Sequence, residues 1–232
     1  MRLLFSILAS ALVIFSTALA AEPPATPRFI AALRAGRAQH IVIYGTSLSK
    51  GGAWVPQLQQ TLDARFPGLV KLTNSARGGQ HSGWGAAHVD SAVVALKPDV
   101  VFIEFAINDA VTRFDLSLDT IRRNVDTILD RIATLPTCEV ILQIMNPAFG
   151  KAEGDSAHRR QQDAYQQIYR DAASRRGLLL VDHAAAWNRL LAAEGEAAVK
   201  KLIPDGVHPN VEGWRRIVTP PLHRALDIAP PP

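Results

Sequence analysis

The sequence is short of cysteine: Cys138 is the only one among 232 residues, so no disulfide can form within the chain. Cys138 also lies far from the N-terminal segment, which leaves no cysteine there to carry a lipid anchor. Asn-x-Ser/Thr glycosylation sites are absent as well. With 48% hydrophobic residues, the chain can nevertheless bury a sizeable core, and its length favours one domain.

Clusters of like charge are also lacking. Lys and Arg number 25 against 21 for Asp and Glu, a formal net charge of +4, and they are scattered along the chain. Adjacent arginines occur as isolated pairs, at positions 122–123, 159–160, 175–176 and 215–216. Such pairs are typical of solvated helix faces, so the sequence indicates no nucleic-acid-binding surface.

The first 20 residues, MRLLFSILASALVIFSTALA, combine Arg2 with an uncharged apolar run and a small-x-small end at Ala18 and Ala20. This pattern predicts a signal peptide cleaved after Ala20, and therefore a periplasmic or secreted protein. An uncleaved membrane anchor is the alternative, because the apolar run is nearly long enough to span a bilayer.

Beyond the signal peptide of residues 1–20, we expect a linker over residues 21–36, a single domain over residues 37–228 and a disordered tail over residues 229–232. Within the domain, short runs rich in Val, Ile and Leu alternate with amphipathic segments. Runs of this kind suit strands that are buried on both faces of a parallel sheet. They cover residues 40–44, 69–73, 99–105, 139–145 and 178–181.

The amphipathic segments predict helices between these strands. The clearest covers residues 121–135, where Ile121, Val125, Ile128, Leu129, Ile132 and Leu135 recur at three- and four-residue spacing. Further helices are expected over residues 54–66, 85–96, 157–176, 184–193 and 212–226. Strands that alternate with helices in this way predict an α/β protein, a three-layer α/β/α sandwich around a parallel sheet.

Ligands of such a sheet bind at the carboxyl ends of its strands. Ser47 follows the first expected strand, residues 74–79 follow the second, and Asn108 with Asp109 follows the third. A serine hydroxyl is a weak nucleophile until a base takes its proton, and the base works best when a third group fixes its tautomer. The sequence must therefore supply a histidine and a partner for it.

His208 is the favoured base among seven histidines. In the stretch PDGVHPN, Asp205 lies three residues before it, close enough for the carboxylate to reach the imidazole ring. Pro209 restricts His208 to extended conformations, and Asn210 can cap the helix that follows. The same stretch could form only a surface turn. His183 is a rival base, but its acidic neighbour is adjacent in an extended segment and would point to the other face.

Acyl transfer also needs donors that face the oxyanion. Gly78 or Gly79 in NSARGGQHS can turn a backbone amide toward a cavity, and Asn108 in FAINDA can offer its carboxamide. Taken singly, these are a common loop and a common helix cap. Together with Ser47 and His208, in chain order and after successive strands, they indicate an oxyanion hole.

The sequence resembles the SGNH (GDSL-type) hydrolases, over residues 40–218. The resemblance is carried by four blocks, which are YGTSLS with Ser47 as nucleophile, NSARGGQ with Gly79 (or Gly78) as an oxyanion amide, AIND with Asn108, and DGVH with Asp205 and His208. It implies a flavodoxin-like sandwich with five parallel strands. It also implies ester hydrolysis through an acyl-enzyme, with no metal or other cofactor, and an oxyanion hole made by the Ser47 and Gly79 amides and the Asn108 side chain.

Two letters depart from the usual blocks of that family. The first block has Thr46 where Asp is usual, and the third begins with Ala106 where Gly is usual. Thr46 keeps a hydrogen-bonding hydroxyl but removes a carboxylate, and Ala106 adds a methyl that narrows the floor of the pocket or shifts Asn108. Ser49 is the weaker candidate for the nucleophile, since the register of the motif selects Ser47.

Substrate contacts are expected in the loop GGQHSGWG, where His81 and Trp84 follow the oxyanion glycine. Aromatic faces near a catalytic serine suit a sugar ring, whereas Trp54, at helical spacing, is typical of core packing. Glu104 and Asp109 could form a metal pair, but Glu104 lies in a strand and alternates face with its neighbour, so a metal is disfavoured.

Three functions remain open. The first is an exported esterase that removes a small acyl group, acetyl in particular, from carbohydrate. The second is a lipase or thioesterase-like enzyme with a longer acyl substrate. The third is a non-catalytic carbohydrate-binding protein that keeps the fold and has lost activity through Thr46 and Ala106.

Overall fold

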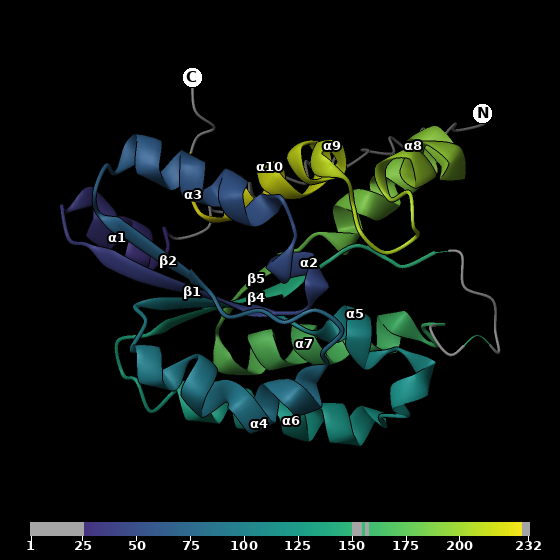
Figure 1. Ribbon diagram of the computed structural model, residues 1–232, viewed down its shortest axis with the longest axis horizontal. Coiled ribbons are helices and arrows are strands. Elements are labelled where there is room, and N and C mark those ends of the chain that lie inside the picture. The colour runs from purple at the N-terminus through teal and green to yellow at the C-terminus, as the bar shows by residue number, and fades with distance from the viewer. Residues whose placement is uncertain (1–25, 150–154, 156–157, 229–232) are drawn as a thin grey trace, which may run out of the picture.

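A computed structural model of the chain describes residues 26–149, 155 and 158–228. The expected signal peptide of residues 1–20 and the expected tail of residues 229–232 lie outside this range. Figure 1 shows one sheet with helices above and below it. Within the described residues, no helix is both long enough and apolar enough to cross a membrane.

Five parallel strands form the sheet, in the spatial order β2-β1-β3-β4-β5. Their bounds are β1 Gln39–Gly45, β2 Val70–Asn74, β3 Val100–Glu104, β4 Glu139–Ile144 and β5 Leu179–Asp182. Each coincides with an expected strand to within about two residues, the usual uncertainty of strand ends. The predicted five-stranded parallel α/β/α sandwich is therefore confirmed.

The helices form two layers (Figure 1). The upper layer contains α1 Arg28–Arg34, α3 Trp54–Arg65, α8 Ala184–Leu202, α9 Val211–Gly213 and α10 Thr219–Ala225, with the π-helical segment η3 Trp214–Val218 between the last two. The lower layer contains α4 Ser82–Ala92, α6 Leu118–Ile132 and α7 Gln162–Arg176, with the short 3₁₀ segments η1 Val94–Leu96 and η2 Thr112–Phe114. Two short helices, α2 Ser47–Lys50 and α5 Ala106–Asp109, follow β1 and β3 directly.

The sheet separates two hydrophobic cores, because successive strand residues point to opposite faces. In β1, Ile41 and Ile43 belong to the core under the upper helices, and Val42 and Tyr44 belong to the core under the lower helices. All four are fully buried. This two-sided burial explains why the strands appear in the sequence as continuous apolar runs.

The helix predicted over residues 121–135 is observed as α6, but it runs from Leu118 to Ile132, so Leu135 lies beyond its end. Its buried residues are Ile121, Val125, Ile128, Leu129 and Ile132, the apolar face expected from the spacing. The helix begins where the Ser117 side chain accepts a hydrogen bond from the N–H of Thr120, a standard N-cap.

Four other expected segments differ from the structure. The helix expected over residues 85–96 begins earlier, at Ser82, because the His81 side chain caps it by accepting from the N–H of Gly83. The helix expected from residue 157 begins at Gln162, after Gln161 in the left-handed region with φ +48°. The part of that expectation at residue 157 lies outside the described residues.

The helix expected over residues 184–193 continues as α8 to Leu202, with one non-helical residue, Gly195, at φ +77°. The segment expected to be a linker, residues 21–36, includes the packed helix α1, in which Phe29, Ile30 and Leu33 are buried. The folded unit therefore starts before residue 37.

Candidate active site

Ser47 is the first residue of α2 and lies near the carboxyl end of β1, an inner strand that pairs with β2 and β3. Thr46 caps the helix, since its hydroxyl accepts a hydrogen bond from the N–H of Leu48 at 3.1 Å. The indole N–H of Trp54, which is fully buried, donates to the Leu48 carbonyl at 2.9 Å. Trp54 therefore packs in the core, as expected, and at the same time fixes the short helix that carries Ser47.

His208 and Asp205 lie beside Ser47. Oγ of Ser47 is 2.8 Å from Nε2 of His208, and Nδ1 of His208 is 2.6 Å from an Asp205 carboxylate oxygen. The other carboxylate oxygen accepts from the backbone N–H groups of Val207 and His208. Burial opposes the ionised form of Asp205, but these hydrogen bonds outweigh it and hold its pKa below the ordinary value. The carboxylate thus stays ionised and faces the imidazole.

The loop that carries Asp205 and His208 is held by residues that follow β4. Gly206 takes φ +79°, and a Cβ there would lie 2.2 Å from the carbonyl oxygen of Phe149. The close approach permits a hydrogen bond from the Phe149 N–H to the Gly206 carbonyl at 2.7 Å. The Asn146 side chain donates to the Val207 carbonyl at 2.8 Å. A glycine is required at this turn because any side chain would collide with the backbone.

The expected oxyanion donors lie at the same edge of the sheet. A Cβ built on Gly78 would be 3.7 Å from the Ser47 Cβ, so this backbone runs against the serine, and Gly79 takes φ +72°. Within the described residues, the N–H groups of Ser47 and Gly79 donate to no protein acceptor. Asn108 is nearly buried, and its carboxamide donates one hydrogen bond, to the Gln80 carbonyl at 2.8 Å. That contact ties α5 to the glycine loop.

A buried carboxylate, Asp109, also holds the end of the glycine loop in place. Asp109 accepts a hydrogen bond from the Ser82 N–H at 2.7 Å and another from the Tyr169 hydroxyl at 2.6 Å. Burial raises the pKa of Asp109 to about 6, although both hydrogen bonds act in the opposite direction. No pattern in the sequence indicates this contact, because Tyr169 lies 60 positions away on α7.

Two alternative assignments lose support from the geometry. Ser49 is fully buried and its hydroxyl donates to Glu104 at 2.8 Å, so it is not available to a substrate. His183 is fully buried and pairs with the side chain of Gln143 at 3.0 Å. Burial lowers the pKa of His183 to about 4. Both side chains are therefore buried and bonded to other groups, so neither the rival nucleophile nor the rival base is open to a substrate.

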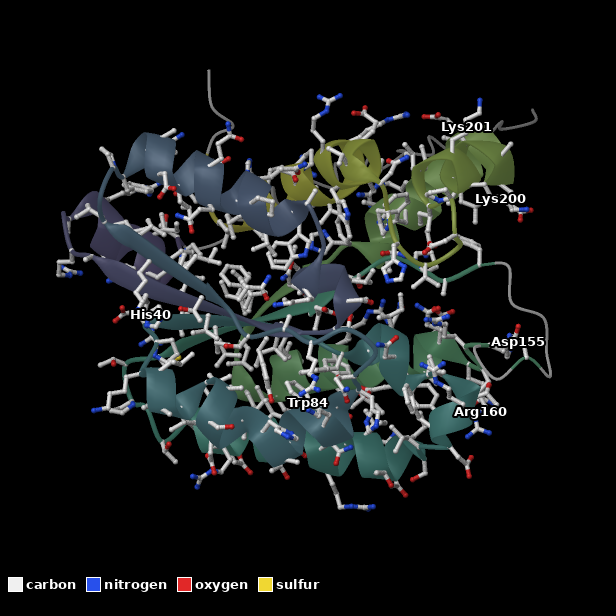
Figure 2. The ribbon with its side chains drawn as sticks, viewed as in Figure 1. His40, Trp84, Asp155, Arg160, Lys200 and Lys201 are labelled. Carbon is white, nitrogen blue, oxygen red and sulfur yellow. The ribbon has the colours of Figure 1, made fainter. Side chains whose placement is uncertain are left out.

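The two expected substrate contacts are engaged elsewhere. His81 caps α4, and its ring lies 4.6 Å from the ring of Phe114. Trp84 lies in the lower helix layer, as Figure 2 shows. Its ring stacks on the ring of His88, with 4.6 Å between the ring centroids, and packs against the ring of Tyr44, with 5.6 Å between the centroids. Both side chains are therefore partly buried within the lower layer, and the structure does not bring them to the pocket beside Ser47.

The pocket beside Ser47 is open and has a volume of about 410 Å³. Its lining is formed by Ser47, Lys50, Gly51, Gly52, His208, Pro209 and Trp214. Lys50 and Trp214 were not identified from the sequence. Trp214 falls within the helix expected over residues 212–226, and in the structure it begins the π-helical segment η3, a feature that is frequent at functional sites.

A five-stranded parallel sandwich with serine, histidine and aspartate in contact at its carboxyl edge defines a serine-dependent hydrolase of carboxylic esters. The chain belongs to the GDSL-like lipase/acylhydrolase family, whose model matches residues 33–216. The resemblance to SGNH hydrolases and the assignment as an ester hydrolase are thereby confirmed.

Relatives of known description support the same class. The chain is 28% identical to an acetylxylan esterase from Geobacillus stearothermophilus over 172 residues, covering 70% of this chain and 76% of that protein. The crystal structure of the acetylxylan esterase from that organism superposes with a TM-score of 0.70 at 24% identity, over 84% of this chain and 96% of the other. An alpha/beta hydrolase enzyme from the metagenome of Lake Arreo, Spain, gives a TM-score of 0.68 at 28% identity, over 82% and 96%.

Proposed function

We propose that Ser47, His208 and Asp205 form a catalytic triad that hydrolyses small acyl esters, acetyl esters in particular, on carbohydrate. The observation that carries the proposal is the continuous hydrogen-bonded chain from Ser47 Oγ to His208 Nε2 at 2.8 Å and from His208 Nδ1 to Asp205 at 2.6 Å. Nucleophile, base and orienting carboxylate are thus in contact in the order that the chemistry requires.

In the acylation step, His208 Nε2 takes the proton of Ser47 Oγ as Oγ forms a bond to the ester carbonyl carbon. The carbonyl electron pair moves onto the oxygen, which is bound by the N–H groups of Ser47 and Gly79 and by the Asn108 carboxamide. When the tetrahedral intermediate collapses, the bond to the alcohol oxygen breaks and His208 returns the proton to that oxygen. The alcohol leaves, and Ser47 carries the acyl group.

In the deacylation step, water replaces the alcohol. His208 takes a proton from the water as its oxygen attacks the acyl carbon, and the same oxyanion donors bind the carbonyl oxygen. Collapse releases the carboxylic acid and returns the proton from His208 to Ser47. Asp205 fixes the ring so that Nε2 faces Ser47 and stabilises the imidazolium in both steps.

A small acyl group is supported by the lining of the pocket. Within the described residues, Trp214 is the only large apolar side chain of the pocket, whereas two glycines and Lys50 make up much of the rest. Such a surface offers little apolar area to a long acyl chain. Trp214 is itself only 3% exposed, so what the pocket offers a sugar is mainly open access and the cationic side chain of Lys50. The acetylxylan esterase relative acts in this class by its description. The signal-like N-terminus adds the proposal that the enzyme is exported and meets its substrate outside the cytoplasm.

The test is acetate release from a panel of acetylated polysaccharides, with Ser47→Ala as the control. We expect release from at least one polysaccharide by the wild type and none above background by Ser47→Ala. Rates on p-nitrophenyl acetate and on longer p-nitrophenyl esters separate the alternatives, since a lipase-like enzyme would be faster on the longer chains.

A fluorophosphonate probe tests the chemistry independently of the substrate. We expect it to label the wild type at Ser47, found by peptide mass analysis, and not to label Ser47→Ala. A folded wild-type protein without label at Ser47 would instead support a carbohydrate-binding protein that has lost activity.

A further inference from the structure

The turn that leads from β1 into α2 and carries Ser47 lies against a buried carboxylate, Glu104, which is not part of the proposed catalytic triad. One carboxylate oxygen of Glu104 accepts from the Thr46 N–H at 2.6 Å, from the Thr46 hydroxyl at 3.0 Å and from the Ser49 hydroxyl at 2.8 Å. The Thr46 hydroxyl donates to Glu104 because it already accepts from the N–H of Leu48. Glu104 therefore holds the residue before Ser47 and the residue two positions after it.

The register of the sheet places Glu104 there. Glu104 ends β3 and pairs with Gly45, the last residue of β1, so its side chain emerges beside the turn that begins α2. A Cβ on Gly45 would lie 2.4 Å from the Glu104 carboxylate. The glycine of the first sequence block is thus required for the carboxylate to reach Thr46.

Among the residues that the structure describes, no cation interacts with the charge of Glu104. The side chain is 1% exposed, and the titratable groups that act on it are Asp109 on α5 and Tyr169 on α7. Burial is the main cause that raises the pKa of Glu104 to about 7, while the hydrogen bonds from Thr46 and Ser49 oppose the rise and Asp109 adds to it. The carboxylate is therefore mostly ionised above about pH 7 and mostly protonated below it.

We propose that ionised Glu104 is a positioning residue that holds the Ser47 hydroxyl and amide in their reactive geometry through Thr46 and Ser49. It supplies from β3 the carboxylate that position 46 lacks. A protonated Glu104 has one ionised acceptor fewer for the three donors of Thr46 and Ser49, and its own O–H, directed at the Thr46 hydroxyl, would compete for that oxygen with the N–H of Leu48. The loss of ionisation would loosen the turn without removing any group that touches the substrate.

The inference rests on Ser47 as the nucleophile, and its first test is Glu104→Gln. This change keeps the shape and removes the charge. On p-nitrophenyl acetate we expect kcat to fall by about 10- to 100-fold while KM changes by less than about threefold, because a nucleophile displaced by a fraction of an ångström reacts slowly but leaves binding intact. The rate of fluorophosphonate labelling of Ser47 should fall by the same factor.

A control separates positioning from a general loss of stability. Val101→Ala removes buried apolar contacts from the same strand, on the lower face of the sheet and away from the turn. It should lower the melting temperature and leave the labelling rate of the folded protein within about twofold of wild type. If Glu104→Gln labels at the wild-type rate, the inference fails. If the wild type itself shows no label at Ser47, the proposed function fails instead.

The pH profile is a readout that a merely structural role would not change. Because protonated Glu104 resembles Gln, the ratio of wild-type to Glu104→Gln kcat/KM should be largest at pH 8.5 and about tenfold smaller at pH 5.5. On the acid side of the pH profile, the slope of log kcat/KM against pH should be larger by one for the wild type than for the variant, because one additional proton inactivates the wild type. A ratio that stays constant between these pH values overturns the role of the charge.

A rescue experiment tests the placement of the carboxylate. Thr46→Asp alone puts a second carboxylate against Glu104 and should reduce kcat by at least about tenfold. Combined with Glu104→Gln, the same change restores one carboxylate beside the turn, and Asp remains a good N-cap for α2. We expect the double variant to exceed both single variants in kcat. A double variant that is slower than both overturns the inference that a carboxylate beside this turn positions Ser47.

Discussion

Oγ of Ser47 lies 2.8 Å from Nε2 of His208, although 161 positions separate the two residues in the sequence. Each partner is held by its own set of contacts. Trp54 binds the helix that starts at Ser47, and Asn146 binds the loop that ends at His208. Because one anchor belongs to α3 and the other to the loop after β4, the short distance between the two side chains depends on the correct packing of several elements at this edge of the sheet.

Asp205→Asn should impair His208 as a base, because it changes which ring nitrogen carries the hydrogen. The Asp205 oxygen that accepts from Val207 and His208 can remain an oxygen in Asn, so the new NH₂ would face His208 Nδ1. The ring would then carry its hydrogen on Nε2 and could not accept the proton of Ser47. We expect kcat on p-nitrophenyl acetate to fall by about 10²- to 10⁴-fold.

A matched control for this change is Asp115→Asn, an exposed carboxylate that pairs with Arg160. Surface pairs of this kind contribute little, so kcat should stay within about twofold of wild type. Wild-type activity in Asp205→Asn would contradict the assignment of Asp205.

Asn108→Ala should remove one donor to the oxyanion. We expect kcat to fall by about 10²- to 10³-fold with little change in KM, because the missing hydrogen bond forms mainly in the transition state. The effect should be smaller than that of Ser47→Ala. Asn124→Ala serves as control, since Asn124 also donates one partly buried hydrogen bond, to Ser82, but from α6. If both variants lose activity equally, the loss comes from a disturbed glycine loop and not from a missing donor to the oxyanion.

Gly206→Ala should disable the catalytic loop, whereas Gly36→Ala should not. Both glycines have positive φ, +79° and +72°, so both changes cost about 1–2 kcal/mol of backbone strain. Only at Gly206 does the new methyl also meet a neighbour, the Phe149 carbonyl at 2.2 Å. We expect a loss of kcat of more than about tenfold for Gly206→Ala alone. Melting curves of the two variants measure the loss of stability that both share from backbone strain. Equal kcat values in the two variants would contradict the role of the Gly206 turn in holding the catalytic loop.

Much of the fold could be predicted from the sequence because the information is local. The spacing of Ile121, Val125 and Ile128 is enough to define α6, and apolar runs define the strands. Helix boundaries were less predictable. The helix expected over residues 184–193 continues past Gly195, because the Ala-, Glu- and Lys-rich residues that follow resume the helix beyond a single non-helical position.

In the candidate site, the motif residues could be predicted but their neighbours could not. Ser47, Asp205 and His208 follow from the chemistry that acyl transfer needs. Trp84 was expected at the substrate because it follows the glycine loop, yet its direction is set by packing on Tyr44. The contact between Glu104 and Thr46 depends on the register of β1 against β3, which a sequence pattern does not contain.

Asp109→Asn should change how stability depends on pH. The pKa of Asp109 is raised from 3.8 to about 6 in the folded state by burial. Between these pH values the folded state holds a proton that the unfolded state has lost, so the contribution of Asp109 to the free energy of unfolding is greatest below about pH 4. It declines as the pH rises to about 6, by roughly 3 kcal/mol at most, and is constant above that.

The asparagine variant cannot titrate, so its stability should lack this decline. We expect the free energy of unfolding of the wild type, minus that of Asp109→Asn, to decrease between pH 4 and pH 7 in urea titrations. Asp109→Asn also keeps an oxygen for the Ser82 N–H, and Tyr169 can rotate its hydroxyl to accept from the new NH₂, so the variant should fold. A difference that is constant with pH would mean that Asp109 is ionised throughout and that its hydrogen bonds from Ser82 and Tyr169 outweigh its burial.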